Sequence, residues 1–391
     1  MLPRFQVSRS ALPRLSAGHP WLYRQALRAL AGTAQTGDVV ELCDDRRTIA
    51  RGVYDAESPL AVRVWCWDEQ ALDAKCVAQR LAHALDLRAR LFDPAQTNAV
   101  RLLHGEADRM PGVVVDRYAD VAVLRTDGEA VARWLTPHRP KLDEALRALG
   151  VTTLLHRRGG PQAKRSPLET LWGEAPRAPV PVVEHGMPFL VDLVHGQKTG
   201  AFLDQRDNRR RIRELTQRGT RVLNLFSYAG GFSLAAALGG ATQVTSVDIA
   251  HDAHRIAQQS FRLAGVDPAT HAFVTADAFQ WLDDAAKRGE RFDLIVSDPP
   301  SFAPNEKSVP KALAAYKRLH RGCTRLLADG GIFCAASCSS HVDARLFVDT
   351  LDDATLERRP LRIVEQRGAP PDHPVLAAFP EGAYLKFFVL R

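Results

Sequence analysis

The chain has 391 residues, 46% of them hydrophobic and 25% charged, which is ordinary for a globular protein and leaves room for two or three domains. No stretch approaches the ~20 apolar residues that a membrane-spanning helix needs, so we exclude a transmembrane protein and expect the cytoplasm as its location. The net charge of +7 favours a polyanionic partner such as nucleic acid, because phosphates attract lysine and arginine at long range, although many basic proteins bind none.

The cysteines argue against a disulfide framework and against a metal site. The chain has six of them: Cys43, Cys66, Cys76, Cys323, Cys334 and Cys338. No two form a CxxC pair, and no histidines cluster at the spacing of zinc ligands. We therefore expect neither a structural disulfide nor a bound metal.

Residues 1–70 have the pattern of a small β-rich domain. Strand-like runs begin at Gly37 and Ser58, and turn residues lie between them. Apolar residues at helical spacing predict a helix over residues 20–30.

Residues 71–185 are expected to form a second domain of α+β type. A helical pattern ends near Leu91, and strand-like runs begin near Val113, Asp120 and Val151. A helix over residues 129–148 separates the second of these strands from the third. We expect the strands to be antiparallel.

Residues 186–391 are expected to form an α/β domain. From about Arg206 onward, apolar strands alternate with helices up to the run GGIFCAAS. Repeated β–α alternation with fully apolar strands predicts a parallel sheet with helices on both faces, the Rossmann-like arrangement.

A glycine turn lies between the first of these strands and its helix. The run from Val222 to Ser233 predicts a strand, a turn with Gly230 and Gly231, and a helix start. Glycine lets the backbone approach a ligand closely, and the N–H groups of a helix N-terminus can bind a carboxylate such as that of a methionine moiety. The alternative is that the glycines merely allow close packing.

Acidic residues follow the next three strands. Asp248 stands about 20 residues beyond the turn, where a carboxylate bonds ribose hydroxyls, although it can also be a helix N-cap. Asp277 can accept from an adenine amino group, and Asp298 ends the fourth strand. The strands open at one sheet edge, GxGxxG is absent, and no basic residue follows Asp248, so an S-adenosylmethionine (SAM) enzyme is favoured over a dinucleotide dehydrogenase.

Longer motifs now identify a resemblance. They are Gly196–Arg209, Asn224–Gly231, Ser297–Phe302, Ser337–Ser339, Asp372–Leu376 and Pro380–Lys386. The chain resembles the bacterial large-subunit ribosomal RNA 5-methylcytosine methyltransferases of the RlmI type. This resemblance implies an N-terminal PUA domain, a middle EEHEE domain, a Rossmann-like methyltransferase domain, SAM as cofactor and large-subunit ribosomal RNA as partner. A homodimer is left open.

The turn, the strand ends and the resemblance together give a set of cofactor-binding candidates. They are Lys198, Thr199, Phe202, Gln205, Arg206, Asn224, Phe226, Ser227, Tyr228, Ala229, Gly230, Asp248, Ile249, Asp277, Ala278, Asp298 and Pro299. The resemblance implies that the first five belong to a cofactor lid, in which Arg206 suits the methionine carboxylate through a bidentate contact.

Cys338 and Asp298 are the catalytic candidates. Carbon 5 of cytosine is a poor nucleophile, and thiolate attack at carbon 6 makes it enamine-like. Cys338 follows an apolar strand and should lie at the sheet edge beside Asp298, which suits the N3 edge of the base. The alternative for Cys338 is a small buried hydrophobe, the role expected of Cys334 and Cys323.

Other acceptors stay open. Asp-Pro-Pro motifs also occur in enzymes that methylate base nitrogens, and guanine-N7 ribosomal RNA methyltransferases share this motif; Cys338 separates the two interpretations. Many RNA 5-methylcytosine enzymes carry a second cysteine where this chain has Ser301. A small-molecule methyltransferase and a non-catalytic RNA-binding protein are further alternatives.

RNA contact is expected at two basic clusters and one aromatic residue. The first cluster contributes Arg157, Arg158, Lys164 and Arg165, and the second spans residues 206–213 on a helix. The second can equally be a solvated helix face. Phe302 can stack on an extruded base.

Overall fold

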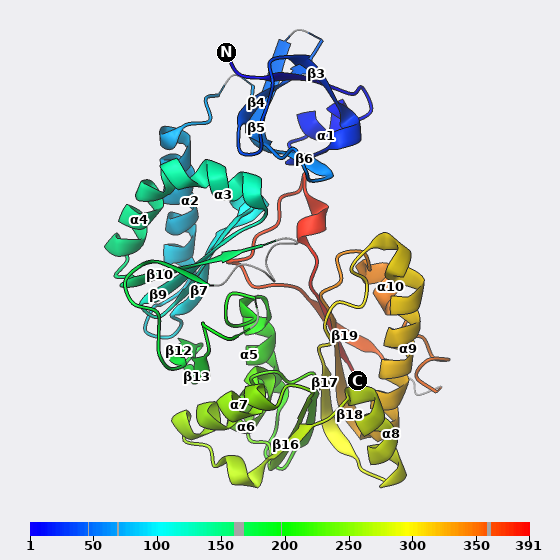
Figure 1. Ribbon diagram of the computed structural model, residues 1–391. Coiled ribbons are helices and arrows are strands. Elements are labelled where there is room, and N and C mark those ends of the chain that lie inside the picture. Colours follow the sequence, from blue (N-terminus) through cyan, green and yellow to red (C-terminus); the bar gives the residue numbers. More distant parts are fainter. Residues whose placement is uncertain (46, 69, 160–167, 197, 358–360) are drawn as a thin grey trace. The chain divides into compact units, whose positions relative to one another are not determined.

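The computed structural model describes residues 1–45, 47–68, 70–159, 168–196, 198–357 and 361–391 (Figure 1). These residues divide into two compact units. The first comprises Met1–Val180, Leu193–Ala201 and Pro371–Gly382, and the second comprises Pro181–Asp192, Phe202–Pro370 and Ala383–Arg391. No helix among the described residues is long and apolar enough to cross a membrane.

The N-terminal part of the first unit is a six-stranded sheet in the order β2-β6-β5-β4-β1-β3. Its interior is aliphatic, with Val40, Leu42 and Val62 fully buried. The elements are β1 (Arg4–Val7), α1 (Leu12–Ser16), β2 (Trp21–Tyr23), β3 (Leu27–Ala31), β4 (Val39–Asp44), β5 (Arg47–Tyr54) and β6 (Leu60–Trp67).

The helix predicted over residues 20–30 is wrong. This segment contains β2, a single 3-10 turn and β3. β2 pairs antiparallel with β6, and β3 pairs antiparallel with β1. Backbone pairing with distant strands has overridden the helical spacing of the apolar residues, one of which, Leu30, is 41% exposed.

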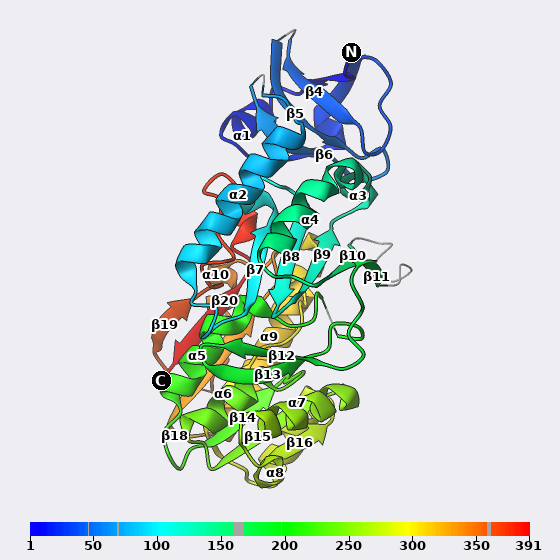
Figure 2. The same ribbon diagram turned by 90° about the vertical axis from the view of Figure 1, so that its left-hand side faces the viewer.

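The rest of the first unit is built around a five-stranded sheet in the order β11-β10-β9-β8-β7. Helices α2 and α4 lie side by side against it (Figure 2). The elements are α2 (Ala74–Leu91), β7 (Ala99–His104), β8 (Val113–Tyr118), β9 (Val121–Thr126), α3 (Glu129–Leu135), α4 (Arg139–Ala148), β10 (Thr153–Arg158) and β11 (Glu169–Trp172).

This sheet departs from the prediction in two ways. Strand β7 adds one strand to the EEHEE order, so three strands precede the helices. The strands were expected to be antiparallel throughout, but β9 and β10 are parallel. Helices α3 and α4 form the crossover that parallel neighbours require, whereas β7–β8, β8–β9 and β10–β11 are antiparallel.

The second unit contains a seven-stranded sheet in the order β16-β15-β14-β17-β18-β20-β19. The first five strands are parallel, and β20 runs antiparallel to both its neighbours. The strands are β14 (Arg221–Leu225), β15 (Gln243–Asp248), β16 (Ala272–Thr275), β17 (Phe292–Ser297), β18 (Leu327–Ser337), β19 (Ile363–Arg367) and β20 (Lys386–Leu390).

Helices cover both faces of this sheet, as predicted. Along β14, Leu223 and Leu225 join the core beneath α8 and α9, whereas Val222 joins the core beneath α5 and α6, the period-two alternation of a strand. The helices are α5 (Arg206–Leu215), α6 (Gly231–Gly239), α7 (His251–Leu263), α8 (Ala278–Lys287), α9 (Val309–Leu326) and α10 (Ala344–Val348).

A hairpin of β12 (Val180–Glu184) and β13 (Met187–Val191) precedes α5. The predicted domain boundary between residues 185 and 186 falls in its turn. Strand order in the main sheet reverses between β14 and β17, and such a switch point opens a crevice outside the carboxyl ends of the strands. The segments that follow β14, β15, β17 and β18 therefore meet at this edge.

Candidate active site

The turn after β14 has a strained backbone. Phe226, Tyr228 and Gly230 have φ values of +57°, +46° and +74°. A left-handed conformation costs a non-glycine residue about 1–3 kcal/mol, and such residues concentrate at ligand sites. The turn is held by bonds from Ser227 N to Val247 O (3.1 Å) and from Gly230 N to Ser227 O (2.8 Å).

Asp248 ties this turn to the next one. One carboxylate oxygen accepts from Tyr228 N at 2.7 Å, and the other accepts from Ala250 N at 2.8 Å. The N-cap of α7 is Ala250, without a side-chain bond, so Asp248 is not a simple helix cap. A carboxylate has about four acceptor sites, which leaves capacity for ribose hydroxyls. The next residue, Ile249, is 77% exposed, and its contact with the cofactor remains a prediction.

Asp277 does cap a helix. Its carboxylate accepts from Gln280 N at 3.0 Å at the start of α8. The following residue, Ala278, is buried. The adenine contact predicted for Asp277 remains a prediction, and it would use the second carboxylate oxygen.

The glycines are required by packing as well as by conformation. A Cβ on Gly230 would lie 2.7 Å from Ala257 Cβ, and one on Gly231 would lie 2.8 Å from Arg209 Cδ. The packing interpretation therefore holds for both glycines, beside the positive φ of Gly230.

A buried polar cluster supports the turn from beneath. Asn224 is 1% exposed and donates through Nδ2 to Ser233 Oγ at 2.8 Å, and Ser246 donates to the same oxygen at 2.7 Å. Asn224 thus supports the turn from the protein interior. The sequence analysis gave Ser233 and Ser246 no role. The available signal was a small polar residue within an apolar helix (Ser233) and within an apolar strand (Ser246).

The predicted lid is divided between the two units. In the first unit, Thr199 is buried, and its hydroxyl donates to Asp116 at 2.5 Å and lies 3.1 Å from the Tyr118 hydroxyl. Lys198 precedes it in the same unit with a φ of +51°. The Thr199 hydroxyl is therefore engaged within its own unit.

The remaining lid residues belong to the second unit. Phe202 packs edge-on against Tyr228, with ring centroids 5.5 Å apart, so it lies beside the glycine turn. Gln205 accepts from Asn208 Nδ2 at 2.7 Å, and the Arg206 side chain is fully buried.

Cys338 and Asp298 leave neighbouring strands at the sheet edge. β17 and β18 are paired, with Ser297 opposite Ala335, and the two residues follow directly after these strands. The Cys338 thiol donates to Pro299 O at 3.9 Å, and both Cys338 and Asp298 are half-buried. Cys334 and Cys323 are fully buried, as predicted, and burial raises the pKa of both thiols.

Side chains from two other elements support the loop that carries Cys338. The buried Tyr316 hydroxyl, on α9, lies 2.9 Å from Ser337 Oγ and 3.0 Å from Ser339 Oγ. Lys386, at the start of β20, donates through Nζ to Ser339 O at 2.6 Å. The sequence analysis gave neither residue a role, although Lys386 ends one of the quoted motifs; a lysine at the start of the apolar strand KFFVL was the available signal.

Phe302 packs into this supporting structure. Its half-buried ring lies 4.9 Å from that of Tyr316 and 6.3 Å from that of Phe279, centroid to centroid. These contacts weigh against the predicted stacking on an extruded base.

The first basic cluster makes contacts within its own unit. Arg157 donates to Leu193 O at 2.7 Å, and Arg158 donates to Glu129 at 2.9 Å. Lys164 and Arg165 lie outside the described residues.

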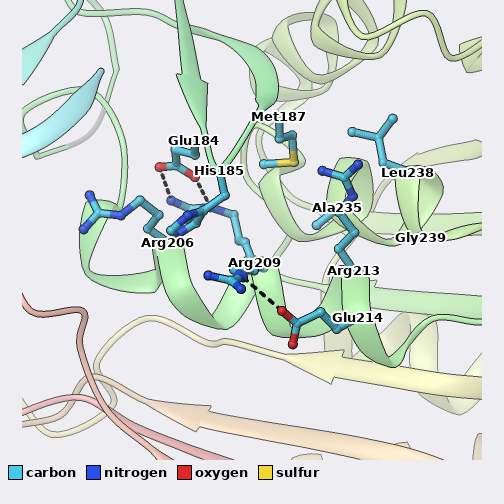
Figure 3. Close-up of a pocket in the computed structure, with 11 residues that line it drawn as sticks. Glu184, His185, Met187, Arg206, Arg209, Arg213, Glu214, Ala235, Leu238 and Gly239 are labelled. Atoms are coloured by element: carbon cyan, nitrogen blue, oxygen red, sulfur yellow. Dashed lines mark hydrogen bonds and ion pairs between the residues drawn. The ribbon is translucent and has the colours of Figure 1, made fainter. Parts of the chain in front are cut away.

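The second basic cluster is largely neutralised. Arg209 forms a buried bidentate pair with Glu184, at 2.9 and 2.6 Å (Figure 3). Arg210 bonds Glu214 at 2.9 Å, and Arg211 bonds Glu365. An ion-paired helix face is therefore the better description of this cluster than a free basic patch.

A pocket of about 430 Å³ lies beside these arginines. The hairpin, α5 and α6 enclose it, and Met187, Ala235 and Leu238 form its apolar wall (Figure 3). It reaches the last turn of α6 at Gly239, whereas the strained turn lies at the start of that helix. Arg206, a predicted cofactor residue, also lines this pocket. Among the described residues, no group of histidine, cysteine and acidic side chains is arranged to hold a metal.

Comparison with known proteins identifies the family of the chain. Residues 148–391 match a family model described as S-adenosylmethionine-dependent methyltransferase, and residues 5–67 match a PUA-like domain. The chain is 35% identical to a ribosomal RNA large subunit methyltransferase I of Escherichia coli O1:K1 / APEC over the full length of both. The protein of that name from Klebsiella pneumoniae strain 342 is also 35% identical, over all of this chain and 98% of its own.

Solved structures confirm the predicted fold class. A methyltransferase crystallised with SAH superposes with a TM-score of 0.86 at 24% identity, and a SAM-dependent methyltransferase from Streptococcus mutans with 0.85 at 22%, each over the whole of both chains. SAM is the cofactor of the matched family. The chain belongs to the S-adenosylmethionine-dependent methyltransferases and, within them, to the ribosomal RNA large subunit methyltransferase I family.

Proposed function

We propose that this protein methylates carbon 5 of a cytosine in large-subunit ribosomal RNA through a covalent adduct with Cys338. The observation that carries the proposal is the position of the thiol at the sheet edge, 3.9 Å from Pro299 O and directly after β18, the strand paired with the one that Asp298 follows. The name of the full-length relatives supports ribosomal RNA as the substrate class, and the net charge of +7 suits a polyanion.

The turn after β14 and the ends of β15 and β16 are suited to the parts of SAM. Asp248 would accept from the ribose hydroxyls, and Ile249 and Ala278 would pack on the adenine, whose amino group Asp277 would bind. The backbone of Phe226–Gly230 would follow the methionine moiety, with Phe202 beside it. We include Gln205, Arg206 and Pro299 in the same site. The cofactor-lid role of Lys198 and Thr199 stays a prediction.

The Cys338 thiolate starts the reaction by attacking carbon 6 of the cytosine. A sulfur–carbon bond forms, the ring electrons shift toward N3, and N3 takes a proton from the Asp298 carboxyl group. Carbon 5 becomes an enamine carbon and therefore a nucleophile. The bound cofactor would supply the electrophilic methyl group, whose bond to sulfur would break, with the electron pair left on sulfur, as carbon 5 forms its new bond to the methyl carbon.

The second half of the reaction restores the aromatic ring. The proton on carbon 5 leaves to water, the bond from carbon 6 to Cys338 breaks, and the double bond between carbons 5 and 6 re-forms. Asp298 takes back the proton from N3, so the enzyme returns to its starting state. Ser301, 3.1 Å from Ser339 Oγ, occupies the position where many RNA 5-methylcytosine enzymes carry a second cysteine.

The direct test is methyl transfer from labelled SAM to large-subunit ribosomal RNA that lacks its native modifications. Nucleoside analysis of the product identifies the acceptor atom. We expect labelled 5-methylcytidine. Labelled 7-methylguanosine would keep the cofactor site but overturn the role of Cys338. Incorporation confined to small acceptors would overturn the RNA substrate.

A further inference from the structure

Lys386 is a lysine buried in the sheet immediately beside the Cys338 loop. It is 5% exposed, which is rare for a lysine unless its ammonium group is satisfied. In the antiparallel pairing of β18 with β20 it stands directly opposite Ser337, the residue before Cys338. The fold therefore brings a charged group to the base of the loop.

The ammonium group is held by backbone carbonyls on both sides. Nζ donates to Ser339 O at 2.6 Å and to Tyr384 O at 2.7 Å. Ser337 and Ser339 flank Cys338, and both also contact the Tyr316 hydroxyl. The Lys386 side chain thus holds Ser339, the residue after Cys338, while strand pairing holds Ser337, the residue before it.

Lys386 and the Cys338 thiol interact electrostatically. Burial lowers the pKa of Lys386 to about 8, and the negative charges of Cys338 and Asp343 oppose that shift. Cys338 and Asp298, the residue after β17, both interact electrostatically with Tyr316 on α9. Burial raises the pKa of the Tyr316 phenol, so it stays neutral. Coulombic coupling between two groups is mutual, so an ammonium that a thiolate stabilises must stabilise that thiolate equally.

We propose that Lys386 is a positioning residue that holds the 337–339 loop by its two carbonyl bonds and, by its charge, keeps Cys338 in the thiolate form. Its importance for methyl transfer rests on the proposed function of Cys338. The effect of Lys386 on the Cys338 thiol does not rest on that function, so the test of Lys386 and the test of the proposed function can fail independently.

The test measures the alkylation rate of each cysteine by iodoacetamide between pH 6 and pH 10, using the full chain without SAM or RNA and mass spectrometry of the cysteine-containing peptides. Lys386→Gln removes the charge but can still donate to the two carbonyls, and Lys386→Arg keeps the charge. Cys76 is an internal control, because it is half-buried, lies in the other unit and has a thiol pKa lowered to about 7 by its hydrogen bond with Cys66.

We expect Lys386→Gln to slow Cys338 alkylation at pH 7 by about tenfold, the change in thiolate fraction for one pKa unit, with no change at Cys76. The difference in Cys338 alkylation rate between Lys386→Gln and the wild-type protein should become smaller above pH 8, where wild-type Lys386 loses its charge. A purely structural role would instead give a difference that does not depend on pH. Lys386→Arg should stay within about twofold of wild type at Cys338, since it keeps the charge.

Equal Cys338 rates in wild type and Lys386→Gln at pH 7 would overturn the proposal. If the variants do not fold, the pH dependence of Cys338 alkylation in the wild-type protein provides the test. Because coupled groups titrate together, the alkylation rate of Cys338 should rise with pH less steeply than that of a single thiol. A curve that fits one titrating group would contradict the proposal. Methyl transfer that survives Cys338→Ala would overturn the proposed function and leave this measurement intact.

Discussion

The turn after β14 and the loop after β18 lie at the same edge of one sheet but are built from different parts of the chain. The first is formed by left-handed backbone, whose amides at Tyr228 and Ala250 are bound by the Asp248 carboxylate. The second is held by side chains from α9 and β20, namely Tyr316 and Lys386. Local sequence therefore encodes the first site, whereas only the folded chain assembles the second.

The largest effect should come from Cys338→Ala. It removes the group that makes carbon 5 reactive, and loss of a nucleophile costs on the order of a thousandfold or more in rate. SAM affinity, measured by equilibrium binding, should stay within about twofold because the cofactor turn is untouched. Cys76→Ser is the matched control and should keep wild-type methyl transfer. Activity near wild type in Cys338→Ala would remove the nucleophile from this loop.

Lys386 should make stability depend on pH. Its folded pKa of about 8 lies below the ordinary value of 10.5, so the folded state holds fewer protons than the unfolded state between these values. Stability should therefore rise from pH 8 to pH 10.5, by up to about 3 kcal/mol from this group, with the full penalty present below pH 8. Denaturant unfolding should show a shallower rise in Lys386→Gln. Parallel curves for the two proteins would contradict the depressed pKa.

Asp248→Ala should weaken the cofactor turn itself. The substitution removes two acceptors of backbone amides and the proposed ribose contact, and a charge-assisted hydrogen bond contributes about 1.5–3 kcal/mol. We expect SAM affinity to fall by roughly 10–100-fold in calorimetry, with a smaller loss for Asp248→Asn, which retains one acceptor oxygen. Unchanged affinity in the alanine variant would remove the ribose role.

Tyr316→Phe should have the smallest of these effects. It deletes the hydroxyl shared by Ser337 and Ser339 but keeps the ring, so it costs about 1–2 kcal/mol of stability. Methyl transfer should fall by roughly fivefold at unchanged SAM affinity, because the loop that carries the thiol is less well held. A loss of SAM affinity instead would mean that the two sites are not independently built.

The comparison also explains which parts of the molecule were predictable. The sheet of the second unit, the turn and the strand-end acids follow from local patterns, since β–α alternation and glycine spacing are properties of neighbouring residues. The helix expected over residues 20–30 failed because β2 and β3 pair with distant strands. The roles of Lys386 and Tyr316 were missed for the same reason: Ser339 lies 47 residues from Lys386, and Ser337 lies 21 residues from Tyr316.

The basic clusters show another limit of the sequence. Arg209, Arg210 and Arg211 form a basic run, yet each pairs with a glutamate, two of which lie far away in the sequence. Charge counted along the chain says nothing of such pairing, so RNA contact cannot be inferred from composition at this helix.

The measurement that tests the covalent mechanism most directly uses RNA in which the target cytosines carry fluorine at carbon 5. Fluorine cannot leave as a proton does, so the methylated adduct should be trapped. We predict a SAM-dependent RNA–protein complex whose cross-linked peptide contains Cys338, and no such complex with Cys338→Ala. An RNA adduct at another residue, or 5-methylcytidine formation on normal RNA without any trapped adduct on the fluorinated RNA, would contradict the account.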